Sequence, residues 1–108
     1  MGRVYSWRPT SNPEKVHIAQ TFASRLRSLY PYPVRVFLVG SVANFRDRLF
    51  SDIDIRVIHM REYGAFSHFR YIVKSLAQAM FYETGVWIDA KIRGDIPIPL
   101  PGKEILAI

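Results

Sequence analysis

The side chains in this sequence that are best suited to chemistry are three aspartates. Asp52 and Asp54 flank Ile53 in the apolar run "DIDIRVI", and Asp89 lies in "GVWIDAKI". Carboxylates that gather in one place repel one another, and a divalent cation offsets that repulsion. Oxygen ligands without cysteine or a nearby histidine favour a hard ion, Mg²⁺ or Mn²⁺. The aspartates are therefore candidate metal ligands and catalytic residues.

A simpler interpretation of the first two aspartates remains open. Asp-x-Asp is a short pattern, and two aspartates at the end of a strand are commonly solvated or paired with basic side chains. Arg46, Arg48 and Lys91 are the basic residues available for such pairs.

The second candidate feature is the pair Gly40 and Ser41, which follows the β-branched, apolar run "VRVFLV". A glycine at this point lets backbone amides approach a phosphate closely, and the serine hydroxyl adds a donor. No Lys-Ser or Lys-Thr follows the glycine, so the segment is not a Walker A loop. An ordinary helix N-cap by Ser41 explains the pair equally well.

Taken together, these motifs resemble the minimal nucleotidyltransferases of the DNA polymerase beta superfamily. The resemblance rests on Gly40–Ser41, on Asp52-Ile53-Asp54 after Ser51, and on Asp89 in a later strand, and it covers roughly residues 12 to 92. One difference is Phe45, where the family commonly has glycine.

The resemblance implies a nucleotidyl transfer with Mg²⁺ or Mn²⁺ as the cofactor. Asp52 and Asp54 would hold two ions, and Asp89 would help to bind the ion that activates the attacking hydroxyl. The Gly40 amides and the Ser41 hydroxyl would hold the β- and γ-phosphates of a nucleoside triphosphate.

Several basic residues are candidates for binding the same nucleotide. Arg46 and Arg48 could reach the triphosphate oxygens, and Arg56, Lys91 and Arg93 could line the cleft further along. Solvent-exposed charge is an equally good explanation for each of them.

The expected acceptor is a hydroxyl on a partner protein, because small members of this superfamily resemble antitoxins that modify a helical HEPN-type partner. Two other functions stay open. One is a catalytically inactive nucleotide- or partner-binding module, which Phe45 favours. The other is a nucleic-acid-binding protein, favoured by the net charge of +6 and by Tyr5 and Trp7 beside arginines.

The elements that must position these residues can be predicted from periodicity. Apolar residues at helical spacing predict helices from Ser11 to about Tyr30 and over residues 65–82, with a short helix from Ser41. Strands are predicted from Val34, over residues 52–58 and from Val86. This pattern indicates an α+β fold, with a small mixed sheet of three or more strands and two main helices packed on one face.

Alternation along the strands predicts which side chains face the helices. Ile53, Ile55 and Val57 share one face of their strand, whereas the aspartates and Arg56 share the other. The same rule places Asp89 on the mixed face of the third strand. We therefore expect the three carboxylates to meet on an open or lightly covered face of the sheet.

Length and composition indicate one domain over residues 1–108, with an N-terminal arm (1–10) and a proline-rich extended tail (94–108). In this tail "RGDIPIPLPG" cannot be a central strand, and "KEILAI" is expected to form a final short element. The chain has no cysteine, no apolar run long enough to span a bilayer and no signal-peptide core, so a cytoplasmic protein is expected. The sequence leaves open whether the chain forms a homo-oligomer.

Overall fold

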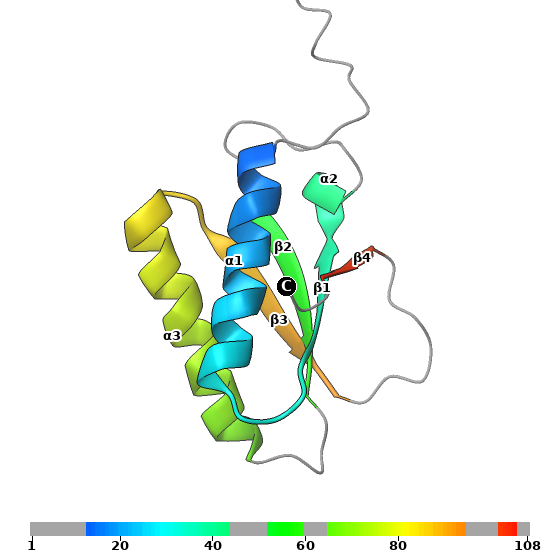
Figure 1. Ribbon diagram of the computed structural model, residues 1–108, viewed down its shortest axis with the longest axis vertical. Coiled ribbons are helices and arrows are strands. Elements are labelled where there is room, and N and C mark those ends of the chain that lie inside the picture. The colour runs from blue at the N-terminus through cyan, green and yellow to red at the C-terminus, as the bar shows by residue number, and fades with distance from the viewer. Residues whose placement is uncertain (1–12, 44–51, 60–64, 95–101, 106–108) are drawn as a thin grey trace, which may run out of the picture.

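The computed structural model describes residues 13–43, 52–59, 65–94 and 102–105 (Figure 1). These residues form an α+β fold in which a four-stranded mixed sheet carries two long helices that pack together. The elements are α1 (Pro13–Leu29), β1 (Arg35–Val39), α2 (Gly40–Ala43), β2 (Ile53–Ile58), α3 (Phe66–Thr84), β3 (Ile88–Arg93) and β4 (Lys103–Ile105).

The two long helices agree with the prediction to within two residues wherever the structure describes their ends. Helix α1 begins at Pro13, where a missing N–H costs nothing, and stops at Leu29 before the "YPYP" segment. Helix α3 runs two residues further than predicted and stops at Gly85, whose φ of 78° is the left-handed cap conformation that glycine adopts readily. The predicted cap residue Ser11 lies outside the described residues.

The strand order in the sheet is β3-β2-β1-β4. Strand β1 is antiparallel to both β2 and β4, whereas β2 and β3 are parallel and are joined through α3. A parallel pair requires a long crossover, which explains why the longest helix lies between these two strands. The arrangement brings the end of β1 and the starts of β2 and β3 to the same end of the sheet.

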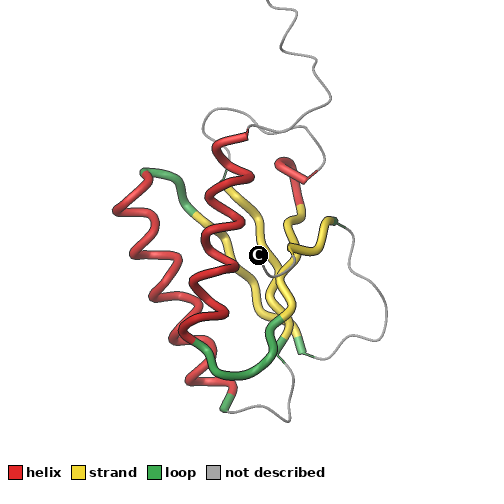
Figure 2. The backbone as a smooth tube through the Cα atoms, viewed as in Figure 1, coloured by secondary structure: helices red, strands yellow, loops and turns green. Residues whose placement is uncertain are grey.

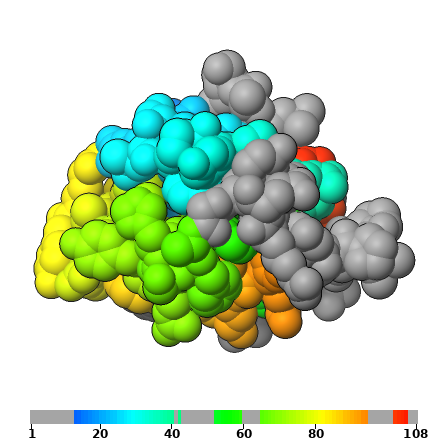
Figure 3. Space-filling view, turned by 90° about the horizontal axis from the view of Figure 1, so that it is seen from below, coloured from blue at the N-terminus to red at the C-terminus, as the bar shows by residue number. Residues whose placement is uncertain are grey.

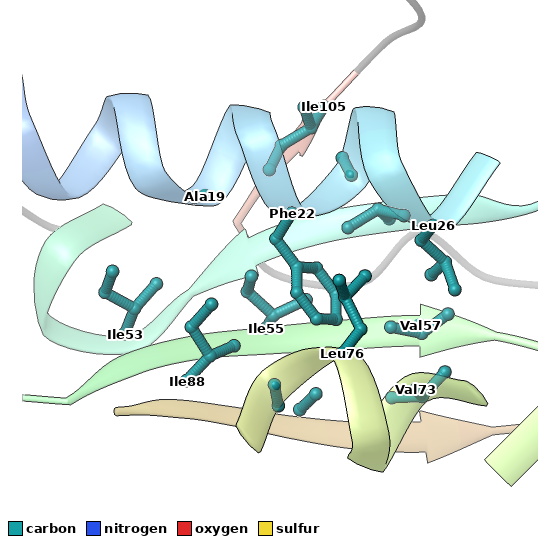
Figure 4. Close-up of a cluster of buried hydrophobic side chains, with 14 of the residues drawn as sticks. Ala19, Phe22, Leu26, Ile53, Ile55, Val57, Val73, Leu76, Ile88 and Ile105 are labelled. Atoms are coloured by element: carbon teal, nitrogen blue, oxygen red, sulfur yellow. The ribbon is translucent and has the colours of Figure 1, made fainter. Parts of the chain in front are cut away.

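One face of the sheet and both helices enclose the main core. Figure 2 shows α1 and α3 side by side over the strands, and Arg25 of α1 pairs with Glu83 of α3 at 2.9 Å. Phe22 is fully buried and reaches from α1 toward Ile55 and Leu76 (Figure 4). The alternation predicted for the strands is confirmed, since the core takes its strand residues from one face: Val36, Leu38, Ile53, Ile55, Val57, Ile88, Ala90 and Ile105.

The opposite face of the sheet is less open than the sequence suggested. Phe37, Val39 and Ile58 are buried there in a separate small cluster. The Arg35 guanidinium lies 5.2 Å from the centre of the Phe37 ring, which is a cation–π contact. Alternation identifies the residues of this face but does not reveal that some of them are covered.

The short final element predicted in "KEILAI" is an edge strand, β4, whereas most of the proline-rich segment before it lies outside the described residues. Strand β4 pairs with β1, and Glu104 accepts hydrogen bonds from Arg35 at 2.8 and 2.9 Å. Arg27 of α1 donates to the carbonyl oxygen of Ile105 and so holds the strand from the helix side. Within the part of the chain that the structure describes, no helix is long and apolar enough to cross a membrane.

Candidate functional site

Two of the three candidate carboxylates are direct neighbours in the sheet. Asp54 of β2 is in register with Asp89 of β3 on one side and with Val39 of β1 on the other. Residues in register project from the same face, and adjacent strands lie about 4.8 Å apart. The structure therefore brings Asp54 and Asp89 together on the face opposite the helices, as the alternation predicted.

The Gly40 turn lies directly against the Asp54 carboxylate. Gly40 has a φ of 72°, and a Cβ placed on it would lie 2.2 Å from Oδ2 of Asp54 and 2.9 Å from its Cβ. Only glycine fits there, because both the backbone conformation and the available space exclude a side chain. The sequence indicates a phosphate-binding role for Gly40 but does not predict this contact, which depends on the antiparallel pairing of Val39 with Asp54.

The environment of Asp54 favours its protonated form. Partial burial is the main cause that raises the pKa of this carboxyl, and the negative charge of Asp89 is the next. Asp52 also raises the pKa of Asp54, whereas Arg56 and Lys91 lower it. Burial and the two neighbouring carboxylates thus raise the pKa of Asp54 by more than the two basic side chains lower it. A bound cation would favour the ionised carboxylate and so lower this pKa.

A pair of cations lies next to the carboxylates on the same face. Arg56 and Lys91 are in register with each other, two residues beyond Asp54 and Asp89. Arg56 also donates a hydrogen bond of 3.3 Å to the Ile55 carbonyl oxygen. The face therefore carries a row of negative charge followed by a row of positive charge.

Other predicted site residues are described only in part. Asp52 is exposed and immediately precedes β2 rather than lying within it. Ser41 belongs to α2, but the position of its side chain is not described, and Arg46 and Arg48 lie outside the described residues. Among residues 13–43, 52–59, 65–94 and 102–105, no three His, Asp or Glu side chains are grouped as ligands for one ion.

Trp87 immediately precedes β3, and its indole is partly exposed. Its ring meets Phe81 of α3 edge-on at 5.5 Å between centroids, and its carbonyl oxygen accepts a hydrogen bond from the Ile53 amide. The backbone of Trp87 therefore helps to fix the register that aligns Asp54 with Asp89.

Comparisons of this chain with protein-family models, with curated proteins and with solved structures find no match.

Proposed function

We propose that this protein is a metal-dependent nucleotidyltransferase with the fold of the DNA polymerase beta superfamily. The observation that carries the proposal is the close contact of the Gly40 turn with Asp54, which is itself in register with Asp89. The glycine turn and the pair of carboxylates thus lie within contact distance of each other. An ordinary helix cap would not require a carboxylate against its glycine.

The residues present fit a hard divalent cation. Asp54 and Asp89 offer oxygen ligands from neighbouring strands, and Asp52 lies close enough to raise the pKa of Asp54. The raised pKa is a cost that a cation would reverse by favouring the ionised carboxylate. Asp52, Asp54 and Asp89 would hold Mg²⁺ or Mn²⁺, which when bound neutralises phosphate charge and makes a hydroxyl more acidic.

In the proposed reaction a hydroxyl oxygen of the acceptor attacks the α-phosphorus of a nucleoside triphosphate. The bond from the α-phosphorus to the bridging oxygen breaks, pyrophosphate leaves, and the hydroxyl proton passes to solvent or to a carboxylate. Gly40 and Ser41 would bind the outer phosphates, while Arg56 and Lys91 offer positive charge on the same face. Positioning and charge neutralisation account for most of the rate in this chemistry.

The proposed acceptor is a hydroxyl of a partner protein, as in the antitoxins that modify HEPN-type proteins. The support for this choice is the resemblance of Gly40–Ser41, Asp52-Ile53-Asp54 and Asp89 to the motifs of small superfamily members that act on a partner protein.

The test is incubation with each α-³²P-labelled nucleoside triphosphate, Mg²⁺ or Mn²⁺, and a lysate of the source cells. Label should appear on a protein and should be lost with Asp54→Asn and with Asp89→Asn. Glu83→Gln is the matched control, because Glu83 is an exposed carboxylate on α3 that pairs with Arg25. This control should transfer label like the parent chain.

Each outcome distinguishes one of the alternatives. Nucleotide binding without transfer would contradict the enzyme and support an inactive binding module of the same fold. Label on RNA or DNA would replace the protein acceptor with a nucleic acid. Neither binding nor transfer with any of the triphosphates would overturn the proposal.

A further inference from the structure

Helix α3 lies along the outer side of β3, and one stripe of the helix borders the strand. Lys74 donates from its ammonium group to the carbonyl oxygen of Ala90 at 2.7 Å, and Phe81 meets Trp87 at 5.5 Å between ring centroids. The two contacts are about 10 Å apart whether measured along the helix or along the strand. Helix and strand are therefore antiparallel neighbours. Ala90 is only 1% exposed, so this side of β3 is closed to strand pairing and offers a partner side chains instead.

Three exposed cations follow this side of the molecule. Arg70 lies one helical turn before Lys74, about 6 Å along the helix, which is the length of two strand residues. It is therefore level with the end of β3, where Arg93 is exposed. Among the described residues, none of these three cations pairs with a carboxylate. The only acidic residue of α3 is Glu83, which pairs with Arg25 of α1. The three positive charges are thus available to an anionic ligand.

Exposed aromatic rings continue the same strip toward the end of α3. Phe81 contacts both Trp87 and Tyr82, with centroid distances of 5.5 and 5.9 Å. Tyr82 is 77% exposed and Trp87 41% exposed. In the space-filling view, β3 (orange) reaches the surface beside α3 (Figure 3). We call this strip the α3–β3 surface, and it consists of Arg70, Lys74, Phe81, Tyr82, Trp87 and Arg93.

Positive charge and exposed aromatic rings in one strip are the two features with which proteins bind single-stranded nucleic acids. The cations neutralise phosphates, and the rings stack on bases whose faces are free because the strand is unpaired. An acidic peptide matches the charge alone, whereas every nucleotide carries both a phosphate and a ring that stacks. The combination therefore favours a nucleic acid as the ligand.

We propose that the α3–β3 surface binds a single strand of nucleic acid, with phosphates on its cations and a base stacked on Trp87. Most of this surface belongs to α3, which lies across the sheet from Asp54 and Asp89. From Arg70 to Phe81 the helix extends about 16 Å, which accommodates more than one nucleotide. Binding requires neither a nucleoside triphosphate nor a metal ion, so it is independent of the proposed transfer reaction.

Fluorescence anisotropy of labelled oligouridylate and oligothymidylate, without triphosphate or metal, tests the charge part of the proposal. The affinity of the full chain should fall steeply with salt, because binding releases counterions. Arg70→Gln with Lys74→Gln should weaken binding about tenfold at low salt and make the log–log salt slope shallower by about 1.4, or about 0.7 per phosphate contact. Lys74→Arg keeps the charge and should bind like the parent chain. Lys103→Gln is the matched control, because it removes an exposed cation from β4 at the opposite edge of the sheet.

Tryptophan fluorescence tests the stacking part. The chain has two tryptophans, Trp7 and Trp87, so Trp7→Phe leaves Trp87 as the only indole. Either oligonucleotide should quench its emission as a base stacks on the ring. Trp87→Ala should weaken binding about fivefold or more with an unchanged salt slope, and Trp87→Phe should retain most of the affinity. Circular dichroism and thermal unfolding check that each variant folds like the parent chain.

The two oligonucleotides also distinguish the source of the strand. Tighter binding of oligouridylate indicates RNA, because only RNA carries the 2′-hydroxyl, and equal binding indicates that phosphates and bases alone are recognised. Either result supports the proposal. No binding at low salt, or binding that Arg70→Gln with Lys74→Gln leaves unchanged, would overturn it. Polyglutamate that binds as tightly and quenches Trp87 as strongly would also overturn it and assign the surface to an acidic protein. None of these outcomes depends on nucleotide transfer.

Discussion

Replacing Gly40 with alanine tests whether the glycine turn and the Asp54 carboxylate form one packed unit. The new Cβ would lie 2.2 Å from Oδ2 of Asp54 and 2.9 Å from its Cβ and Cγ. Rotation of the carboxylate could relieve the first contact, but the Cβ of Asp54 is fixed by strand β2. The positive φ of 72° adds a backbone penalty for any residue other than glycine.

The expected loss of stability is the sum of these two effects. An alanine in the left-handed region costs roughly 1–2 kcal/mol, and forcing extra volume into a packed position costs about 1–3 kcal/mol. Gly40→Ala should therefore lower the free energy of unfolding by about 2–5 kcal/mol. A loss of about 2 kcal/mol corresponds to a fall in Tm of roughly 8–16 °C for a domain of this size.

Gly85→Ala is the matched control for the backbone effect. Gly85 has a similar φ of 78°, but an added Cβ would meet no atom within 4 Å. Its substitution should cost only about 1–2 kcal/mol, the backbone penalty alone. Urea unfolding followed by circular dichroism measures both values at the same pH.

A double-mutant cycle isolates the contact with Asp54. In the Asp54→Gly background the atoms that Gly40→Ala would strike are gone, so the cost of that substitution should fall to the cost of Gly85→Ala. The expected coupling is about 1–3 kcal/mol. Equal costs of Gly40→Ala in both backgrounds would refute the argument that the turn packs on the carboxylate.

Three further predictions concern single residues. The pKa of Asp54 is raised above its ordinary 3.8, so ionisation of this carboxyl destabilises the fold. The free energy of unfolding of the parent chain, measured by urea titration, should therefore fall relative to that of Asp54→Asn as pH rises above about 4. Arg27→Met removes the hydrogen bond to the Ile105 carbonyl oxygen, so hydrogen exchange should accelerate for the amides of Lys103–Ile105 but not for those of Ile53–Ile58. Phe22→Ala leaves a cavity between α1, α3 and the sheet and should cost about 3–5 kcal/mol in the same unfolding assay.

Local patterns were sufficient to predict most of the fold. Alternation placed Ile53, Ile55 and Val57 in the core, because one face of a strand that packs under helices has to be apolar. The helix predicted over residues 65–82 likewise buries one apolar side, which includes Phe69 and Val73. The glycine that follows α3, Gly85, explains where that helix ends, since glycine readily adopts the left-handed cap conformation.

The pairing of distant segments could not be predicted in the same way. Strand β4 is only three residues long, and its place beside β1 depends on Arg27 and Arg35, which contact it from a helix and a neighbouring strand. The contact between Gly40 and Asp54 likewise depends on the register of β1 with β2. Such contacts arise from tertiary packing and leave no periodic signal in the sequence.

The position of β4 has a consequence for how the chain folds. Strand β1 is made early in synthesis, yet one of its two neighbours, β4, is made only after α3 and β3. Closing so long a loop is entropically costly, so this pairing should form late and limit the folding rate. Until then the apolar run Arg35–Val39 has an unpaired edge while the protein is still being made. A nascent chain that pauses before Lys103 would therefore be prone to aggregate through β1.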